Sequence, residues 1–168
     1  LSHDFGNGQA AFDFRKGQGG NLTITNNTVY KGFREGLRDE IPFSGKITIS
    51  NNTFANITGS NSRGMLRFNG DVSNGIECSK NLFITMPTGN FPFVSKKEAD
   101  VSFSANFFFG INEDNWFANS SVVDKATATA NGGGVLTSSP FADADNGDFT
   151  VTYATVKAAG AGDPRWLK

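Results

Sequence analysis

One strand-turn-strand phrase recurs four times in this chain of 168 residues, and it constrains the fold more than any other feature. Each copy alternates apolar and polar residues, as a strand with one buried face requires, and then breaks at an Asn. Such regular spacing is typical of solenoids, in which each repeat forms one turn of a stack. The copies are L-T-I-T-N-N-T-V from Leu22, I-T-I-S-N-N-T-F from Ile47, I-E-C-S-K-N-L-F from Ile76 and V-S-F-S-A-N-F-F from Val101.

The sixth residue of each copy is an Asn, and these four Asn residues are 25, 29 and 25 residues apart. Asn tolerates left-handed corners and caps the backbone there, so their expected role is structural. Stacked turns would let the aligned side chains bond from one corner to the next. The four residues are Asn27, Asn52, Asn81 and Asn106.

A second strand precedes each phrase and ends on a Phe. Phe14, Phe43, Phe68 and Phe93 are 29, 25 and 25 residues apart, so two independent columns share one period. The pattern predicts an all-β fold: a single-stranded right-handed parallel β-helix of about four to five coils with a C-terminal cap. A leucine-rich repeat is the main competing solenoid, but its L-x-x-L-x-L signature is absent. A β-sandwich would not predict such even columns.

Composition excludes several classes of function. The net charge is -1, which provides no global field for nucleic acid or an anionic membrane. Cys78 is the single cysteine, so no intrachain disulfide or cysteine-type zinc cluster can form. No apolar run approaches the roughly 20 residues of a membrane-spanning helix. The chain is expected to be soluble.

The C-terminal segment is the part of the chain that carries a family resemblance. It contains S-P-F-A-D-A-D-N-G-D-F-T-V-T from Ser139 and A-A-G-A-G-D-P-R-W from Ala158. These phrases resemble the tail of the pectate-lyase-like β-helix superfamily, in an uncharacterised extracellular subgroup of Bacteroidetes type that ends in G-x-G-D-P-R-W. The resemblance implies a secreted or surface-attached bacterial protein that handles polysaccharide, with its substrate groove along the Phe strand.

Residues 1–112 are therefore expected to form the coils, and residues 113–168 an irregular connection and a cap of the same domain. Past Phe109 the chain should leave the stack. Asn146 and Gly147 predict a tight turn into a strand over 149–152, and Trp166 is expected to plug the last coil.

The densest charged patch lies beside the Phe strand. If Phe12 and Phe14 point inwards, Asp13 and Arg15 point outwards. The same rule puts Pro42, Arg67 and Pro92 on later rungs of the Asp13 column, with Asp13 and Arg67 two rungs, roughly 10 Å, apart. The loop over residues 31–40 adds further charges next to this column. A mixed-charge loop of this kind is also typical of an ordinary solvated surface.

This patch contains the residue types that β-elimination of uronic-acid polymers needs, namely an Arg base and a cation that neutralises the substrate carboxylate. The candidates for the base are Arg67 and Arg63. The candidates for calcium ligands are Asp13, Asp39 and Glu40. The candidates for substrate contacts are Arg15, Arg34, Arg38, Tyr30 and Phe33.

Two functions of different class remain open. The first is a non-catalytic protein that binds an acidic polysaccharide, either pectin-like or glycosaminoglycan-like. The alternative is a polysaccharide lyase with an Arg base and calcium. No paired Asp motif or G-H-G motif supports hydrolysis, and His3 is the only histidine. The missing catalytic signature favours binding, while the glycan and the oligomeric state stay open.

Overall fold

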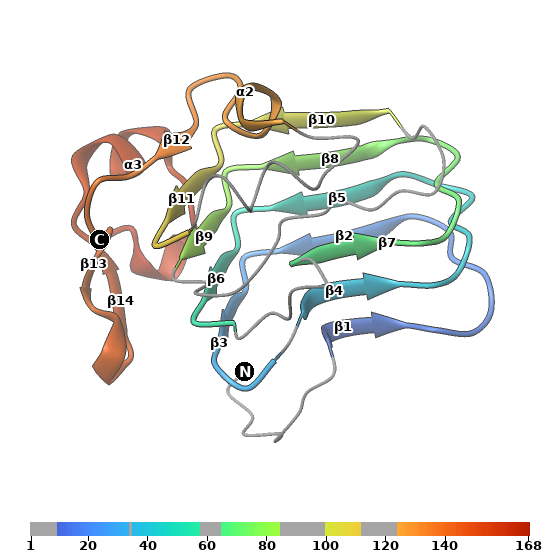
Figure 1. Cartoon of the computed structure of the whole chain (residues 1–168), viewed down its shortest axis with the longest axis horizontal. Coiled ribbons are helices and arrows are strands. Elements are labelled where there is room, and N and C mark those ends of the chain that lie inside the picture. The colour runs from blue at the N-terminus through green and yellow to red at the C-terminus, as the bar shows by residue number, and fades with distance from the viewer. Residues whose placement is uncertain (1–9, 34, 58–64, 85–99, 112–123) are drawn as a thin grey trace.

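A computed structural model describes residues 10–33, 35–57, 65–84, 100–111 and 124–168 of the chain. Three parallel sheets run along its length (Figure 1). The first sheet has the order β1 (Ala10–Phe14), β4 (Glu35–Asp39), β7 (Leu66–Phe68). The second has the order β10 (Val101–Ser104), β8 (Ile76–Ser79), β5 (Ile47–Ser50), β2 (Leu22–Thr25). The third has the order β12 (Gly134–Val135), β11 (Phe107–Phe109), β9 (Leu82–Ile84), β6 (Thr53–Ala55), β3 (Thr28–Tyr30).

Each repeated phrase forms one strand of the second sheet, a tight corner and one strand of the third sheet. Equivalent residues of successive copies pair in parallel, for example Ile24 with Ile49 and Ile49 with Cys78. Since the second sheet has four strands, the chain winds through about four turns. The predicted all-β parallel solenoid is confirmed.

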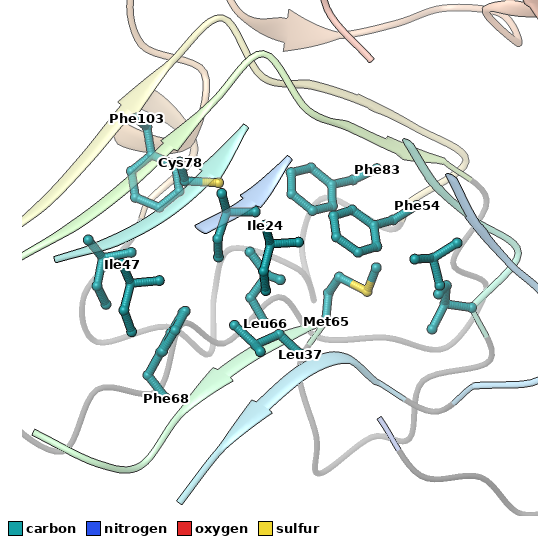
Figure 2. Packing of buried hydrophobic residues seen from close by; sticks show 14 of the residues in the cluster. Ile24, Leu37, Ile47, Phe54, Met65, Leu66, Phe68, Cys78, Phe83 and Phe103 are labelled. Carbon is teal, nitrogen blue, oxygen red and sulfur yellow. The ribbon is translucent and has the colours of Figure 1, made fainter. Parts of the chain in front are cut away.

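The interior is filled by columns of apolar side chains that repeat from turn to turn. The ring of Phe83 stacks between Phe54 and Phe108, with centroid separations of 5.5 Å and 5.3 Å. Figure 2 shows the Phe54 and Phe83 rings next to each other, with Leu37 and Leu66 from the first sheet below them. Parallel rungs bring like residues into contact, so one good packing choice is repeated along the stack.

A ladder of Asn side chains runs along the corner between the second and third sheets. The Nδ2 of Asn52 donates to the Oδ1 of Asn81 (3.0 Å) and to the carbonyl of Ile24 (2.8 Å). Asn81 repeats the pattern, donating to Asn106 (3.0 Å) and to the Ile49 carbonyl (2.9 Å). The expected bonding from corner to corner is confirmed, because buried amides must find partners and the next turn supplies them.

The left-handed residue of this corner lies one position before the ladder. Asn26 and Asn51 have φ values of 59° and 54°, but Lys80 and Ala105 adopt the same conformation at 55° and 54°. The expectation that the ladder Asn itself occupies the left-handed position is therefore wrong. The neighbouring strands and the ladder Asn force Lys80 and Ala105 into this left-handed conformation, which costs about 1 kcal/mol of conformational energy for each residue.

The second strand of the first sheet lies earlier than predicted. The partner of β1 is β4, so Phe14 faces Asp39, and Asp39 in turn faces Phe68. Phe43 lies in the corner that follows, where it bridges Gly19 and Val72. Phe14 and Phe43 are therefore not equivalent positions of successive turns, because Phe14 lies in a strand and Phe43 lies in a corner. Phe93 lies outside the described residues.

The stack continues beyond Phe109, contrary to expectation. β12 pairs in parallel with β11 and adds a fifth rung to the third sheet, after the short helix α2 (Lys125–Ala128). Asn131 has φ 54° and donates to the Phe103 carbonyl (3.1 Å), as the ladder residues do one turn below. The A-T-A-T-A-N-G-G-G stretch is therefore a fifth, partial copy of the corner.

The remaining C-terminal segment covers the outer face of the third sheet (Figure 1). Its hairpin pairs β13 with β14 and turns at the predicted Gly147, which has φ 85°. A second hydrophobic cluster lies between this segment and the sheet, and includes Leu82, Phe107 and Phe149. The elements are β13 (Phe141–Asp143), η1 (Ala144–Asn146), β14 (Asp148–Val151), α3 (Ala154–Ala159) and η2 (Pro164–Trp166).

The G-D-P-R-W motif fastens this segment to the side of the solenoid. Asp163 is fully buried, accepts from the Thr28 hydroxyl (2.7 Å), and its backbone N–H donates to the Thr53 hydroxyl (3.1 Å). The indole N–H of Trp166 donates to the Thr28 hydroxyl at 2.8 Å. Thr28 belongs to the first turn, so the expectation that Trp166 plugs the last coil is wrong.

Replacing Asp163 by Asn should destabilise the fold by about 2 to 4 kcal/mol, because it removes a buried acceptor on which several donors converge. Burial disfavours its charge, but hydrogen bonds from Arg165 and Thr28 overcome this and lower the pKa of Asp163. Urea unfolding at pH 7 measures the change. The exposed Asp148→Asn variant is the matched control, and equal losses in the two variants would contradict the role of the motif.

Candidate functional site

The outer face of the first sheet carries two columns of polar side chains that run along the stack. Register places Asp13, Arg38 and Arg67 on successive rungs of one column. Backbone bonds from Glu40 to Phe14 and from Asn69 to Asp39 continue the same register beyond the strands. The second column is therefore Arg15, Glu40 and Asn69. We call these six residues the charged face.

Acids and arginines alternate on this face. Arg38 makes a two-pronged contact with Asp13, from Nε to Oδ1 at 2.9 Å and from Nη2 to Oδ2 at 2.7 Å. Arg15 approaches the same carboxylate, with its Nη2 2.9 Å from Oδ2. The hydrogen bond with Asp13 raises the pKa of Arg38 above its ordinary value. Arg38 is thus held as a cation, the opposite of what a general base needs.

Arg67 is the centre of a second group on the same face. Its Nη2 lies 3.0 Å from Glu40 and its Nη1 lies 3.4 Å from Glu35. With its amide oriented to satisfy both groups, Asn69 accepts from the Arg67 Nε at 2.7 Å. Arg38 also lies 3.9 Å from Glu40, which links the two groups.

The three arginines differ in how much they offer to a ligand. The side chain of Arg15 is 44% exposed, that of Arg67 is 19% exposed and that of Arg38 is 8% exposed. Ion pairs at exposed positions contribute at most about 1 kcal/mol each. Arg15 and Arg67 are therefore the groups that can exchange part of their protein contacts for a ligand.

Five of the predicted site residues meet on this face, namely Asp13, Arg15, Arg38, Glu40 and Arg67. Asp13 and Arg67 are two rungs apart, as expected. The residue between them is Arg38 and not Pro42, because β4 begins earlier than the Phe spacing suggested. Arg34 and Arg63 lie outside the described residues.

The two predicted aromatic contacts lie elsewhere. Phe33 is 8% exposed and belongs to the main hydrophobic core. Tyr30 packs edge-on against Phe149 at 4.9 Å, and its hydroxyl donates to the Asp145 carbonyl at 3.3 Å. The expectation that these rings face a glycan on the charged face is wrong. Phe33 is buried in the core, and Tyr30 packs against the C-terminal hairpin.

Asp39 is fully buried below the charged face. Its Oδ1 accepts from the Ile41 N–H at 2.7 Å, and its Oδ2 has no hydrogen-bond partner among the residues that the structure describes. Burial raises the pKa of Asp39 to about 6, and the neighbouring charge of Glu40 adds to the rise. A carboxyl group in this position is therefore protonated more readily than an ordinary aspartate.

The predicted calcium ligands do not form a common site. Asp39 is buried, while Asp13 and Glu40 are both held by arginines. Across the part of the chain that the structure describes, no group of three His, Cys, Asp or Glu side chains is arranged to hold a metal ion. Asn69 joins the site without having been predicted. Glu35, one of the charges of the predicted loop over residues 31–40, contacts Arg67 from a buried position. Reading E-G-L-R-D as a strand would have placed Glu35 inwards, on the same side as Leu37.

Fold and site together define a parallel β-solenoid with an ion-paired face along its first sheet. Residues 47–166 match the model of a protein family described as "Domain of unknown function (DUF5123)", and the chain belongs to this family. The match begins at β5 and ends at Trp166, so it includes the motif that fastens the C-terminal segment. No curated protein and no solved structure matches the chain. No helix among the described residues is long and apolar enough to cross a membrane.

Asp39→Asn should change how stability depends on pH. Because the folded pKa of about 6 lies above the ordinary value of 3.8, the wild-type protein loses stability from this group as pH rises between those two values. The unfolding free energy of Asp39→Asn relative to wild type should therefore increase from pH 4 to pH 7.

Denaturant unfolding at both pH values measures this difference. Asp148→Asn is the control, because hydrogen bonds from Thr150 lower the pKa of Asp148 below 3.8, so its contribution should change little between pH 4 and pH 7. A relative stability of Asp39→Asn that does not vary with pH would show that this carboxyl group is not held as described.

Proposed function

We propose that this protein binds an acidic polysaccharide along the charged face and performs no chemistry on it. The observation that carries the proposal is the placement of Arg38 and Arg67 on consecutive rungs, with Arg15 on the neighbouring column. Rungs of a solenoid are about 4.8 Å apart, so the guanidinium groups form a row and not a point. A row of cations suits an extended polymer with repeated anionic groups.

The chemistry of the side chains supports the same class of ligand. A guanidinium group has five N–H donors in a plane and matches carboxylate and sulfate groups. Asp13 and Glu40 hold the arginines in place. The resemblance of the tail to extracellular polysaccharide-handling β-helices agrees with this ligand, and an extracellular bacterial location is part of the proposal.

Elimination by Arg67 and Arg63, with calcium, is the alternative. An arginine base must lose its proton, whereas Arg67 donates to Glu40 and to Asn69. The three predicted calcium ligands are not available together, because Asp39 is buried while Asp13 and Glu40 are paired with arginines. Binding without cleavage is therefore the better supported of the two functions.

Binding is tested with polygalacturonate, alginate and chondroitin sulfate, by affinity electrophoresis and calorimetry with and without calcium. Arg15→Gln and Arg67→Gln should each weaken the affinity for the preferred polymer by about tenfold, or about 1.4 kcal/mol. Binding should weaken further as salt screens the charges. Lys46→Gln is the matched control, since Lys46 is exposed on the second sheet and pairs with Glu77.

Two results would contradict the proposal. Equal affinities for Arg15→Gln, Arg67→Gln and Lys46→Gln would remove the charged face as the binding surface. A rise in ultraviolet absorbance from unsaturated chain ends would favour the lyase. Circular dichroism of each variant verifies that the fold is kept.

A further inference from the structure

A pocket of about 350 Å³ lies on a different side of the molecule from the charged face. It is formed where the third sheet meets the C-terminal hairpin. Its first wall is a single column of the sheet, in which register places Ala55, Ile84 and Phe109 on successive rungs. Phe141 of the hairpin extends this apolar wall. The volume is at the lower end of the range for small-molecule sites.

The hairpin wall is held firmly in place. Phe149 packs edge-on against Phe141 at 5.3 Å and against Trp166 at 5.6 Å. The Tyr30 hydroxyl ties the Asp145 backbone to the first turn of the solenoid. A pocket between two fixed walls loses little conformational freedom when a ligand enters.

The rim of the pocket is polar and has both donors and acceptors. Asn56 and Ser139 have side chains that can do both, and Asp143 and Asp145 add carboxylates. The Asp143 carboxylate accepts from the Asn146 amide at 2.7 Å. The Asp145 carboxylate makes no hydrogen bond within the described part of the chain. None of the described residues that line the pocket is basic.

We propose that this pocket binds an uncharged sugar ring. The flat C–H face of a pyranose fits against the apolar column, and its hydroxyls can donate to the carboxylates and exchange bonds with Asn56 and Ser139. Two carboxylates on the rim, with no basic side chain among the described lining residues and only Lys31 acting on Asp145 from outside the pocket, disfavour uronic acids and sulfated sugars here. An amine would use the carboxylates but would leave the donors of Asn56 and Ser139 unused. The site is independent of polymer binding on the charged face.

The test titrates the ¹⁵N-labelled full chain with glucose, galactose, xylose, glucuronate and an alkylamine, and follows the backbone amides by NMR. At least one neutral sugar should shift the amides of residues 142–145, and glucuronate should shift them far less. Asp145→Asn should weaken the neutral-sugar affinity by about tenfold. Ser139→Trp, which fills the pocket from its exposed rim, should abolish the shifts.

Asp148→Asn is the matched control, since it lies on the same hairpin outside the pocket, and it should bind as wild type does. No shift with any neutral sugar, stronger shifts with the amine, or undiminished binding in both pocket variants would overturn the proposal. Arg15→Gln should leave these shifts unchanged and Asp145→Asn should leave polymer binding unchanged. Failure of either site is thereby distinguishable from failure of the other.

Discussion

The hydrogen-bonded ladder of Asn side chains is the interaction on which the rest of this structure depends. Each buried Asn amide bonds to the Asn of the next turn and to a strand carbonyl of the turn before, so it holds three successive turns together. A buried amide without partners would cost about 1 to 3 kcal/mol, and no shifted register satisfies all of them at once. The ladder thereby aligns the strands on both sides of the corner, and with them the Phe54, Phe83 and Phe108 stack.

Fixed register turns the outer faces of the sheets into ordered columns, which the chain uses in different ways. The outer face of the third sheet carries apolar side chains. The C-terminal segment packs on them, and the two together form the second hydrophobic cluster. That cover reaches back to the first turn through Asp163 and Thr28, so the G-D-P-R-W motif, which lies within the residues that match the family, has a structural role. The first sheet instead carries ion-paired arginines and acids on its outer face. We therefore propose the first sheet, and not the covered third sheet, as the binding surface.

The sequence predicts the parts of this structure that repeat at a constant period. The four Asn positions and the alternation around them establish two of the three sheets. The Phe spacing gives the two-rung separation of Asp13 and Arg67, although with the wrong residue between them. The early start of β4 was missed because loop lengths absorb insertions, so the Phe14 to Phe43 interval reads as one period when it contains a slip. Asp39 was misplaced because the early start of β4 was missed, so its inward position two residues after Leu37 was not expected. Phe33 and Trp166 were misplaced because their surroundings are set by contacts between residues far apart in the chain, and no local pattern records these.

Arginine modification in the presence of ligand tests the central claim that the charged face is the binding surface. The protein would be treated with phenylglyoxal alone and with saturating acidic polysaccharide, and each modified arginine would be quantified by mass spectrometry. The account predicts that the polymer protects Arg15 and Arg67 and leaves Arg165 reactive, since the Arg165 side chain is 67% exposed on the C-terminal segment. Protection of Arg165 with no protection of Arg15 or Arg67 would contradict it.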